Sequence, residues 1–534
     1  MGNRLYYGDN LHVLRESIAD ESVDLIYLDP PFNSNASYNV LFKAPGGAQS
    51  QAQIEAFDDT WHWNESAALA FDEVMTGGHS EAAIMLRAMR SALGENDMMA
   101  YLAMMAVRLL ELRRVLKPTG SIYLHCDTTV SAYLKILLDG IFGPEMFRNE
   151  IIWARHNARS VRQTIWPRLH DVILHYGNGE GTIFTTTIVP SGTVSDPHDL
   201  VRGPDGLRYR TRDLTGAGIR TGETGRPWRG VNPTDQGRHW RIMHAALNKI
   251  EAEGRIHMQS GGMPRERDAA PYVPEERMAV VGDVWTDIPS LNSGAAERLG
   301  YPTQKPVALL ERIIEASSAE EAVVLDPFCG CGTTVHAAQK LKRRWIGIDI
   351  THLSIALIER RLKDAFPGIG FTVHGVPKDT DGARDLAERD KHEFQKWIVA
   401  NIGGQPYKSG KKGMDRGIDG YLHFRDAANK PQFAIVSVKG GGIKSGDIRD
   451  LKGTMEREGA PLGVFLTLKE PTREMEREAA AAGFYESGGQ KIPRVQILTA
   501  SQVISGQRPR APFGHTESLK KATREKQDQQ PELF

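Results

Sequence analysis

Strand-like and helix-like segments alternate from the start of the chain to about residue 375, and this alternation constrains the fold more than any other feature. The strand-like runs are VDLIYLD (23–29), SIYLHCD (121–127), HDVILHYG (170–177), AVVLDPF (322–328) and RWIGIDI (344–350). Helix-like runs occur at 98–118 and 306–318. Such alternation is typical of a parallel sheet that is covered by helices and binds ligands at the carboxyl ends of its strands. We therefore predict an α/β fold with a Rossmann-like sheet.

The bulk composition excludes several classes of protein. A chain of 534 residues is too long for one core, so we expect two or three domains. Lys and Arg (66) balance Asp and Glu (67), so a surface for nucleic acid would have to be local. Three cysteines are too few for a disulfide framework and indicate a reducing compartment. No apolar run approaches ~18 residues and the start, MGNRLYYGDN, does not resemble a signal peptide, so we expect a cytoplasmic protein without a membrane span.

Composition also marks the expected domain boundaries. Apolar periodicity fades between about 181 and 290, where Gly, Arg, Thr and Trp become frequent, and then resumes. We predict a first domain at 1–375, a charged linker or linking helix at 376–390, a second and smaller α/β domain at 391–508, and a disordered tail at 509–534.

A glycine-bearing turn, DPFCGCGTT, follows the strand at 322–328 and is the first candidate site. Gly330 and Gly332 let a ligand approach the backbone closely, and Thr333 and Thr334 can cap the next helix. Asp349 ends the following strand, about twenty residues further on, where an acid can bind a ribose hydroxyl. The alternative is a tight strand–helix turn without a ligand.

The residues inside this turn narrow the choice of ligand. A dinucleotide motif would place a third glycine where Val335 stands. Asp326 would repel a pyrophosphate but suits a cationic ligand, which favours a nucleoside with a positive centre such as S-adenosylmethionine. Cys329 and Cys331 stand one residue apart without other cysteines or clustered histidines, so we interpret them as packing residues, not zinc ligands.

The second candidate site is LDPPF (28–32), where a buried strand ends in an acid, two prolines and an aromatic ring. The exocyclic amine of adenine or cytosine is a poor nucleophile, so a catalyst must hold its N–H groups with acceptors. Asp29 and the carbonyl of Pro30 supply acceptors, and the two prolines, Pro30 and Pro31, keep them aimed. Phe32 offers a face on which a base can stack after leaving its duplex. The alternative is an ordinary strand exit.

Taken in order, these motifs resemble the amino-methylating DNA methyltransferases of the permuted β class. The resemblance rests on YYGDN (6–10), LDPPF (28–32), SIYLHCD (121–127), HDVILHY (170–176), YPTQKP (301–306), DPFCGCGTT (326–334) and WIGIDI (345–350). It implies a permuted methyltransferase sheet, with a target-recognition region at about 181–290 between the catalytic motif and the cofactor turn. It also implies direct methyl transfer from S-adenosylmethionine to double-stranded DNA, without a metal or a covalent intermediate.

The resemblance also assigns roles to residues. It places Asp29, Pro30, Pro31 and Phe32 in catalysis. The residues that it places around the cofactor are Asp9, Thr303, Lys305, Asp326, Phe328, Gly330, Gly332, Thr333 and Asp349. An acid at the first motif position favours adenine N6 as the target, with cytosine N4 left open. A restriction-modification role, a place at the nucleoid and a homodimer are further expectations.

Arginines interleave with aromatic residues in the expected recognition region, at 202–241. Arginine can bind phosphates and read guanine, and Tyr209, Trp228 or Trp240 can fill the gap that a flipped base leaves. The alternative is a solvated loop whose tryptophans pack against the main domain.

The second domain resembles the Mrr-like branch of PD-(D/E)xK nucleases, through GMDRGIDGYLHF (413–424) and QFAIVSVKGG (432–441). Asp419, Lys439 and Glu393 fit that pattern, which would hold Mg²⁺ beside a phosphate with Asp419 as a metal ligand. Ser437 breaks the pattern where Glu or Gln is expected. Cleavage by an active nuclease and DNA binding by a silent one both stay open.

The chain ends in QDQQPELF, which resembles the short motif by which bacterial proteins dock on the sliding clamp. Gln530, Leu533 and Phe534 would be its anchors, because an apolar pair in a disordered tail has no core to join.

Overall fold

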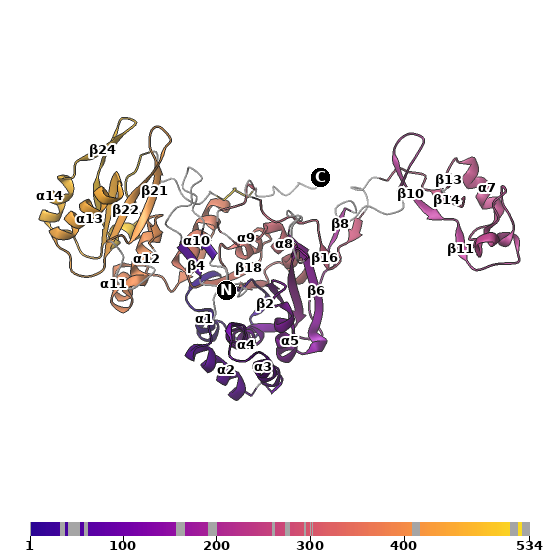
Figure 1. Cartoon of the computed structure of the whole chain (residues 1–534), viewed down its shortest axis with the longest axis horizontal. Coiled ribbons are helices and arrows are strands. Elements are labelled where there is room, and N and C mark those ends of the chain that lie inside the picture. The colour runs from indigo at the N-terminus through magenta and orange to yellow at the C-terminus, as the bar shows by residue number, and fades with distance from the viewer. Residues whose placement is uncertain are drawn as a thin grey trace. The chain divides into compact units, whose positions relative to one another are not determined.

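The structure is a computed structural model, and it describes most of the chain. The described residues are 2–31, 38–40, 54–57, 62–78, 80–155, 166–190, 200–258, 262–272, 278–292, 295–299, 301, 303–407, 417–512 and 522–525. They form two compact units (Figure 1). One is Thr186–Gly282, and the other combines Met1–Thr185 with Asp283–Phe534. No helix in these described ranges is long and apolar enough to cross a membrane.

A nine-stranded sheet organises the larger unit, in the order β16-β6-β7-β5-β2-β17-β18-β1-β19. Its strands are β1 (Asn3–Tyr7), β2 (Val23–Leu28), β5 (Leu116–Cys126), β6 (Phe147–Ala154), β7 (His170–Gly177), β16 (Val284–Trp285), β17 (Val323–Asp326), β18 (Arg344–Asp349) and β19 (Phe371–His374). All run parallel except β7, which is antiparallel to both of its neighbours. The sheet confirms the predicted α/β class.

Strand order brings the two candidate loops together. β2 pairs in parallel with β17, with Leu25 opposite Val324 and Ile26 opposite Leu325. Parallel neighbours end at the same edge of a sheet, so the residue that follows β2, Asp29, lies beside the last residue of β17, Asp326. These residues are far apart in the sequence, and only the sheet makes them neighbours.

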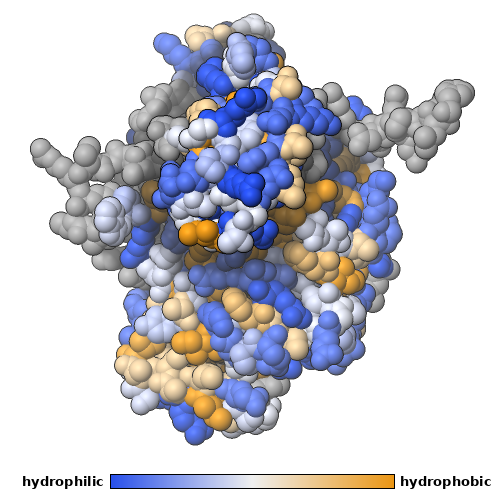
Figure 2. All heavy atoms as spheres, turned by 90° about the vertical axis from the view of Figure 1, so that its right-hand side faces the viewer, coloured by the Kyte–Doolittle hydropathy of each residue, from blue (hydrophilic) through white to orange (hydrophobic). Residues whose placement is uncertain are grey.

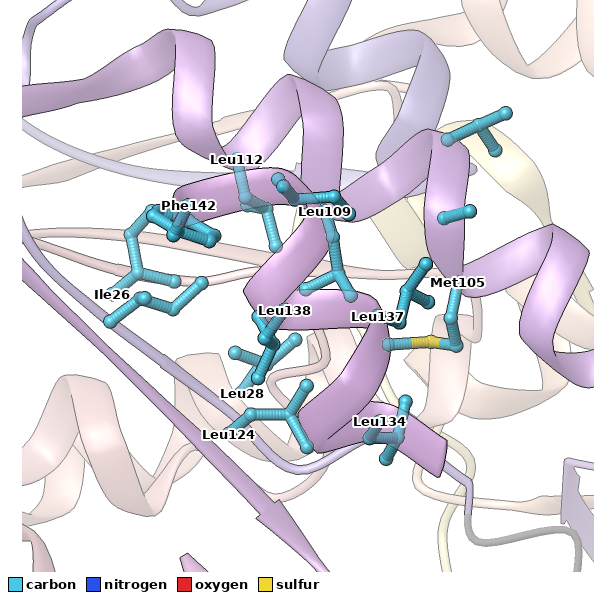
Figure 3. Close-up of a cluster of buried hydrophobic side chains, with 14 of the residues drawn as sticks. Ile26, Leu28, Met105, Leu109, Leu112, Leu124, Leu134, Leu137, Leu138 and Phe142 are labelled. Carbon is cyan, nitrogen blue, oxygen red and sulfur yellow. The ribbon is translucent and has the colours of Figure 1, made fainter. Parts of the chain in front are cut away.

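One face of the sheet packs against helices α4 (Asp97–Val115) and α5 (Ser131–Phe142). Figure 3 shows Ile26, Leu28 and Leu124 of the strands facing leucines of both helices. α4 begins where the Asn96 side chain accepts a hydrogen bond from the Met99 N–H. It ends at Val115, earlier than the predicted 98–118, because the chain turns directly into β5 at Leu116.

The opposite face of the sheet is also covered. Side chains alternate along a strand, so Tyr123 points away from Ile122 and Leu124. Its hydroxyl is 2.6 Å from that of Ser317, at the end of helix α8 (Val307–Ser317). Helices α9 (Thr333–Lys340) and α10 (His352–Ala365) follow β17 and β18 in the chain.

A five-stranded sheet organises the C-terminal module, in the order β20-β21-β22-β23-β26. Its strands are β20 (Gln405–Pro406), β21 (Gly420–Arg425), β22 (Pro431–Lys439), β23 (Leu462–Thr467) and β26 (Val495–Thr499). Its helices are α11 (Thr380–Arg389), α12 (Lys391–Asn401), α13 (Ser445–Glu458), α14 (Arg473–Ala480) and α15 (Ala500–Ile504). Val436 and Val438 pack with α11, α12 and α15, while Ile435 packs with α13 and α14. The module is therefore a small α/β domain with helices on both faces.

The structure adds to what was expected of the segment at 376–390 and differs from the disorder expected of the tail at 509–534. Of the two alternatives for residues 376–390, a linker or a linking helix, the structure shows a helix, α11, whose Leu386 is buried in the core of the C-terminal module. Part of the expected disordered tail, 522–525, lies against the first domain. The Glu525 N–H donates to the Ala365 carbonyl at 3.0 Å, and its carboxylate is 2.9 Å from His336 Nε2.

The smaller unit, Thr186–Gly282, has its own sheet and core. A four-stranded sheet is formed by β13 (Ile256–Met258), β14 (Pro264–Arg267), β10 (Arg208–Asp213) and β9 (Leu200–Arg202). Trp228 and Trp240 pack with Leu247 and Ile250 of helix α7 (His244–Ala252). Figure 2, in which this unit faces the viewer, shows mostly hydrophilic side chains on its surface.

The place of α11 leads to a stability prediction. Replacing Leu386 with Ala should destabilise the C-terminal module by about 3 kcal/mol, because it removes a buried side chain and leaves a cavity. Replacing Glu388, exposed on the same helix, with Ala should change stability by less than about 0.5 kcal/mol. Hydrogen exchange of peptides from β21 and β22 measures the local unfolding free energy. Equal exchange in the two variants would show that α11 is not part of this core.

Candidate functional site

A cavity of about 290 Å³ lies at the carboxyl ends of β1, β2, β17 and β18. The predicted residues that line it are Asp9, Asp29, Pro31, Thr303, Lys305, Asp326, Phe328, Gly330, Thr333 and Asp349. Gly332 and Pro30 belong to the same two loops without lining the cavity, and Phe32 lies outside the described residues. The structure thus brings the expected cofactor and catalytic residues into one site.

In the turn after β17, backbone N–H groups donate hydrogen bonds to the carboxylates of two aspartates. The Phe328 N–H donates to Asp326 Oδ1 at 3.0 Å, and the Gly330 N–H donates to Asp349 Oδ2 at 2.8 Å. Gly330 and Gly332 have φ of +53° and +76°, which favours glycine. The predicted caps are wrong: Gly332 is the N-cap of α9 and Thr333 is its first residue. The Thr334 hydroxyl instead hydrogen-bonds with Asp326.

Two acids face the cavity in a poorly hydrated place. Burial raises the pKa of Asp326 to about 7, and the charges of Asp29 and Asp349 add to this, against hydrogen bonds from Thr334 and the Phe328 N–H. Burial also raises the pKa of Asp349, whose other oxygen accepts from the Thr351 N–H and hydroxyl. A cationic ligand would relieve the cost of ionising these groups.

An arginine that sequence reasoning missed holds the turn after β1. Arg108 of α4 is 5% exposed, and its guanidinium donates to Asp9 Oδ2 at 2.9 Å and to Asn10 Oδ1 at 2.7 Å. Asn10 in turn donates to the Pro327 carbonyl at 2.9 Å. Arg108 therefore connects the Asp9 turn with the turn after β17. The available signal was a single arginine among the apolar residues of 98–110.

The catalytic loop is joined to the predicted cofactor segment by an ion pair. Lys305 Nζ donates to Asp29 Oδ2, and both side chains are largely buried. Lys305 was expected only around the cofactor, whereas the structure pairs it with Asp29, which was predicted to be catalytic.

A buried hydrogen-bonded network that the sequence did not reveal lies beside this loop. The Tyr27 hydroxyl is 2.8 Å from His125 Nδ1, and His125 Nε2 is 3.1 Å from Asp171 Oδ2. Burial acts to raise the pKa of Asp171, but the hydrogen bond from His125 and the charges of His125, Lys305 and Arg155 hold it below its usual value. The motifs SIYLHCD and HDVILHY supply these residues, so the resemblance marked their strands but not their contact.

The three aromatic residues that were predicted to fill the gap left by a flipped base are buried within the smaller unit. Trp228 and Trp240 form the core of the smaller unit, with their indole N–H groups bonded to Asn248 and to the Arg226 carbonyl. Tyr209 is buried under the Arg267 guanidinium, 4.2 Å from the ring centroid. Trp228 and Trp240 are therefore core residues of the smaller unit, and contact of this region with DNA stays a prediction. The arginines at 202, 212, 220 and 229 are exposed.

The nuclease-like pattern is only partly assembled. Asp419 precedes β21, and its carboxylate accepts hydrogen bonds from the Val438 N–H at 2.6 Å and from Gln395 Nε2 at 3.0 Å. The helix residue that faces Asp419 is thus the neutral Gln395. Ser437 lies buried on β22, and Lys439 ends that strand.

The third residue of that pattern, Glu393, was assigned wrongly. Residues two apart on a helix point to different sides, so Glu393 does not share the face of Gln395. Its carboxylate instead accepts from the Tyr7 hydroxyl at 2.6 Å, at the end of β1. A Mg²⁺ site built from Asp419 and Glu393 does not fit this geometry.

Comparison with known proteins identifies a family for each of two parts of the chain. A family described as DNA methylase matches residues 23–360, more than half of the chain, so this chain belongs to that family. Residues 391–504 match a second family, described as NACHT-associated inactive Restriction Endonuclease 1. The second match supports a nuclease-like module but neither the Mrr-like branch nor an active enzyme.

Individual relatives are distant. The type II methyltransferase M.EcaI of Enterobacter cloacae is 27% identical over 73% of this chain and 76% of its own length. The Mod subunit of the type III restriction-modification enzyme StyLTI, from Salmonella typhimurium, is 27% identical over 64% of this chain, and the match spans half of that protein. Among solved structures, the complex of M1.HpyAVI with SAM is 13% identical, with 67% of this chain and 99% of that one covered and a TM-score of 0.30.

The backbone of the turn after β17 allows a stability test. A Cβ at Gly332 would lie 2.8 Å from Ile358 Cγ1 at a φ of +76°, so Gly332→Ala should lower stability by about 2 kcal/mol. Gly453, within α13, has open space around it, and Gly453→Ala should be neutral or stabilising. Thermal unfolding of the two variants tests this difference. A melting temperature unchanged in Gly332→Ala would contradict the described turn.

Proposed function

We propose that this DNA methylase transfers a methyl group from S-adenosylmethionine to the N6 amine of adenine in double-stranded DNA. The main support for the proposal is that Asp29 and Asp326 line the same cavity, at the carboxyl ends of two paired strands. The family match supports methylation of DNA, and the acid at the start of LDPPF favours adenine. Relatives named as restriction-modification enzymes support a role in such a system.

The residues of the cavity fit S-adenosylmethionine. Asp326 offers a carboxylate to a cationic centre, Asp349 stands where a ribose hydroxyl would bind, and Phe328 offers a ring to the adenine. Gly330 and Gly332 have no side chains, so the ligand can approach the backbone at these two positions. When bound, the cofactor would supply a sulfonium methyl group: the amine would take the methyl group, the sulfur would leave as a neutral thioether, and the methylated nitrogen would lose one N–H proton.

The residues of the catalytic loop hold the amine of the extruded base. Lys305 pairs with Asp29 Oδ2, so we assign Oδ1 and the Pro30 carbonyl as acceptors of the amine N–H groups. This pairing fixes the carboxylate against rotation and aims it before the base arrives. Phe32 is proposed as the stacking surface for that base.

Replacing Asp29 with Ala should reduce methyl transfer by about two orders of magnitude, because the acceptor of the amine is lost. Asp72→Ala, at an exposed position of helix α2 (Glu65–Thr76), is the matched control and should keep full activity. Incorporation of tritiated methyl groups into DNA measures the rate, and mass spectrometry of the nucleosides identifies the base. N4-methylcytosine would move the target to cytosine, and full activity of Asp29→Ala would reject the proposed site.

The nuclease-like module is proposed to be silent, because Asp419 faces a neutral amide and Ser437 replaces an acid. Incubation of the same wild-type protein with Mg²⁺ and unmethylated DNA should therefore leave the DNA uncut.

The residues predicted to bind the sliding clamp, Gln530, Leu533 and Phe534, lie outside the described residues. That interaction and a homodimer stay predictions.

The raised pKa of Asp326 predicts how cofactor binding depends on pH. A cationic ligand favours the ionised carboxylate, so below about pH 7 binding must release a proton from Asp326. The dissociation constant should fall as the pH rises from 6 to 7, by at most about tenfold, and level off above pH 8. Calorimetry in buffers of different ionisation enthalpy detects the released proton. Asp326→Asn should abolish both effects, and an identical pH profile in that variant would contradict the assignment.

A further inference from the structure

The carboxylate of Glu393, in the C-terminal module, contacts the methyltransferase sheet and does not take part in the nuclease-like pattern. Glu393, in the first turn of α12, accepts from the Tyr7 hydroxyl at 2.6 Å and from Lys396 Nζ at 2.7 Å. Tyr7 is the last residue of β1, so the bond joins the two domains of the larger unit. A hydrogen bond to a carboxylate is among the stronger ones in proteins.

His352 completes this cluster. Its ring stacks on Tyr7, with the centroids 3.8 Å apart and the planes at 11°. Its Nε2 is 3.6 Å from the Glu393 carboxylate, and the side chain is 3% exposed. Burial lowers the pKa of His352 to about 4, so its ring is neutral at neutral pH. We call these three residues the Tyr7–His352–Glu393 cluster.

The two sheet-side members of this cluster border the cofactor cavity. Gly8 and Asp9, which follow Tyr7, line the cavity, and so do Ile350 and Thr351, which precede His352. The turns are bonded to each other, because the Gly8 N–H donates to the Asp349 carbonyl at 3.0 Å. Helix α12 therefore contacts both turns through residues adjacent to those that line the site.

We propose that Tyr7, His352 and Glu393 are positioning residues through which the C-terminal module holds the cofactor turns in place and strengthens binding of S-adenosylmethionine. The inference rests on the proposed function of that cavity. Its physical basis is preorganisation: turns that are already ordered lose less conformational freedom when the ligand binds. The module then has a function that does not require nuclease chemistry.

Loss of the Tyr7–Glu393 hydrogen bond can be separated from loss of packing by the choice of variant. Without Glu393, the Tyr7 hydroxyl loses its acceptor at a half-buried place, and the stacked pair loses its contact with α12. Tyr7→Phe removes the hydroxyl but keeps the ring that stacks on His352. Glu393→Gln keeps an acceptor for Tyr7 and removes the charge. These mild changes separate the hydrogen bond from simple loss of packing.

Calorimetric titration of the full chain with S-adenosylmethionine tests the proposal. Glu393→Ala and Tyr7→Phe should each raise the dissociation constant by about fivefold, and Glu393→Gln should restore part of the loss. The double variant Tyr7→Phe/Glu393→Ala should lose no more than either single variant, because both remove one bond. In steady state, KM for the cofactor should rise while kcat changes little.

Hydrogen exchange without any ligand gives an independent measurement. Peptides that cover residues 7–13 and 349–355 should exchange faster in Glu393→Ala than in wild type. Glu456→Ala, an exposed glutamate on α13, is the matched control and should match wild type in affinity and exchange. Wild-type affinity and exchange in all cluster variants would overturn the inference and leave the proposed function standing. Failure of the wild-type chain to bind S-adenosylmethionine would overturn both.

Discussion

The parallel pairing of β2 with β17 is the constraint on which the rest of the site depends. Asp29 directly follows β2 and Asp326 ends β17, so the pairing sets these acids side by side although almost the whole first domain separates them in the sequence. Hydrophobic burial fixes the register, because Ile26 and Leu325 belong to the same core and a slip of one residue would turn them to the other face. The chemistry of the site is thus a consequence of core packing.

Much of the first domain could be predicted from the sequence. Strands buried on both faces leave long apolar runs, and acids, prolines and glycines at their ends mark the ligand edge. Contacts such as Arg108 with Asp9, or His125 with Asp171, could not be predicted, because they join elements whose separation along the chain carries no local signal. The ion pair of Lys305 with Asp29 was missed for the same reason.

The errors in the other regions have physical causes as well. Trp228 and Trp240 were predicted either to fill the gap of a flipped base or to pack against the main domain. In the structure they pack in the core of the smaller unit, because a small unit needs its few large apolar residues there. Glu393 was matched by its position on a helix, whereas the direction of the helix face decides what it contacts, and Gln395 takes the place beside Asp419. A linking helix at 376–390 was one of two alternatives, but its place in the core was missed because only Ala383, Leu386 and Ala387 form a short apolar stripe among charged residues.

The most direct measurement is a crystal structure of the chain with double-stranded DNA and a non-reactive analogue of the methyl donor. We expect an adenine outside the helix, with its amine bonded to the Asp29 carboxylate and about 3.5 Å from the position of the transferable group, and with the analogue against the turn at 326–334. A donor analogue bound away from that turn, or an extruded base that does not contact Asp29, would contradict this expectation.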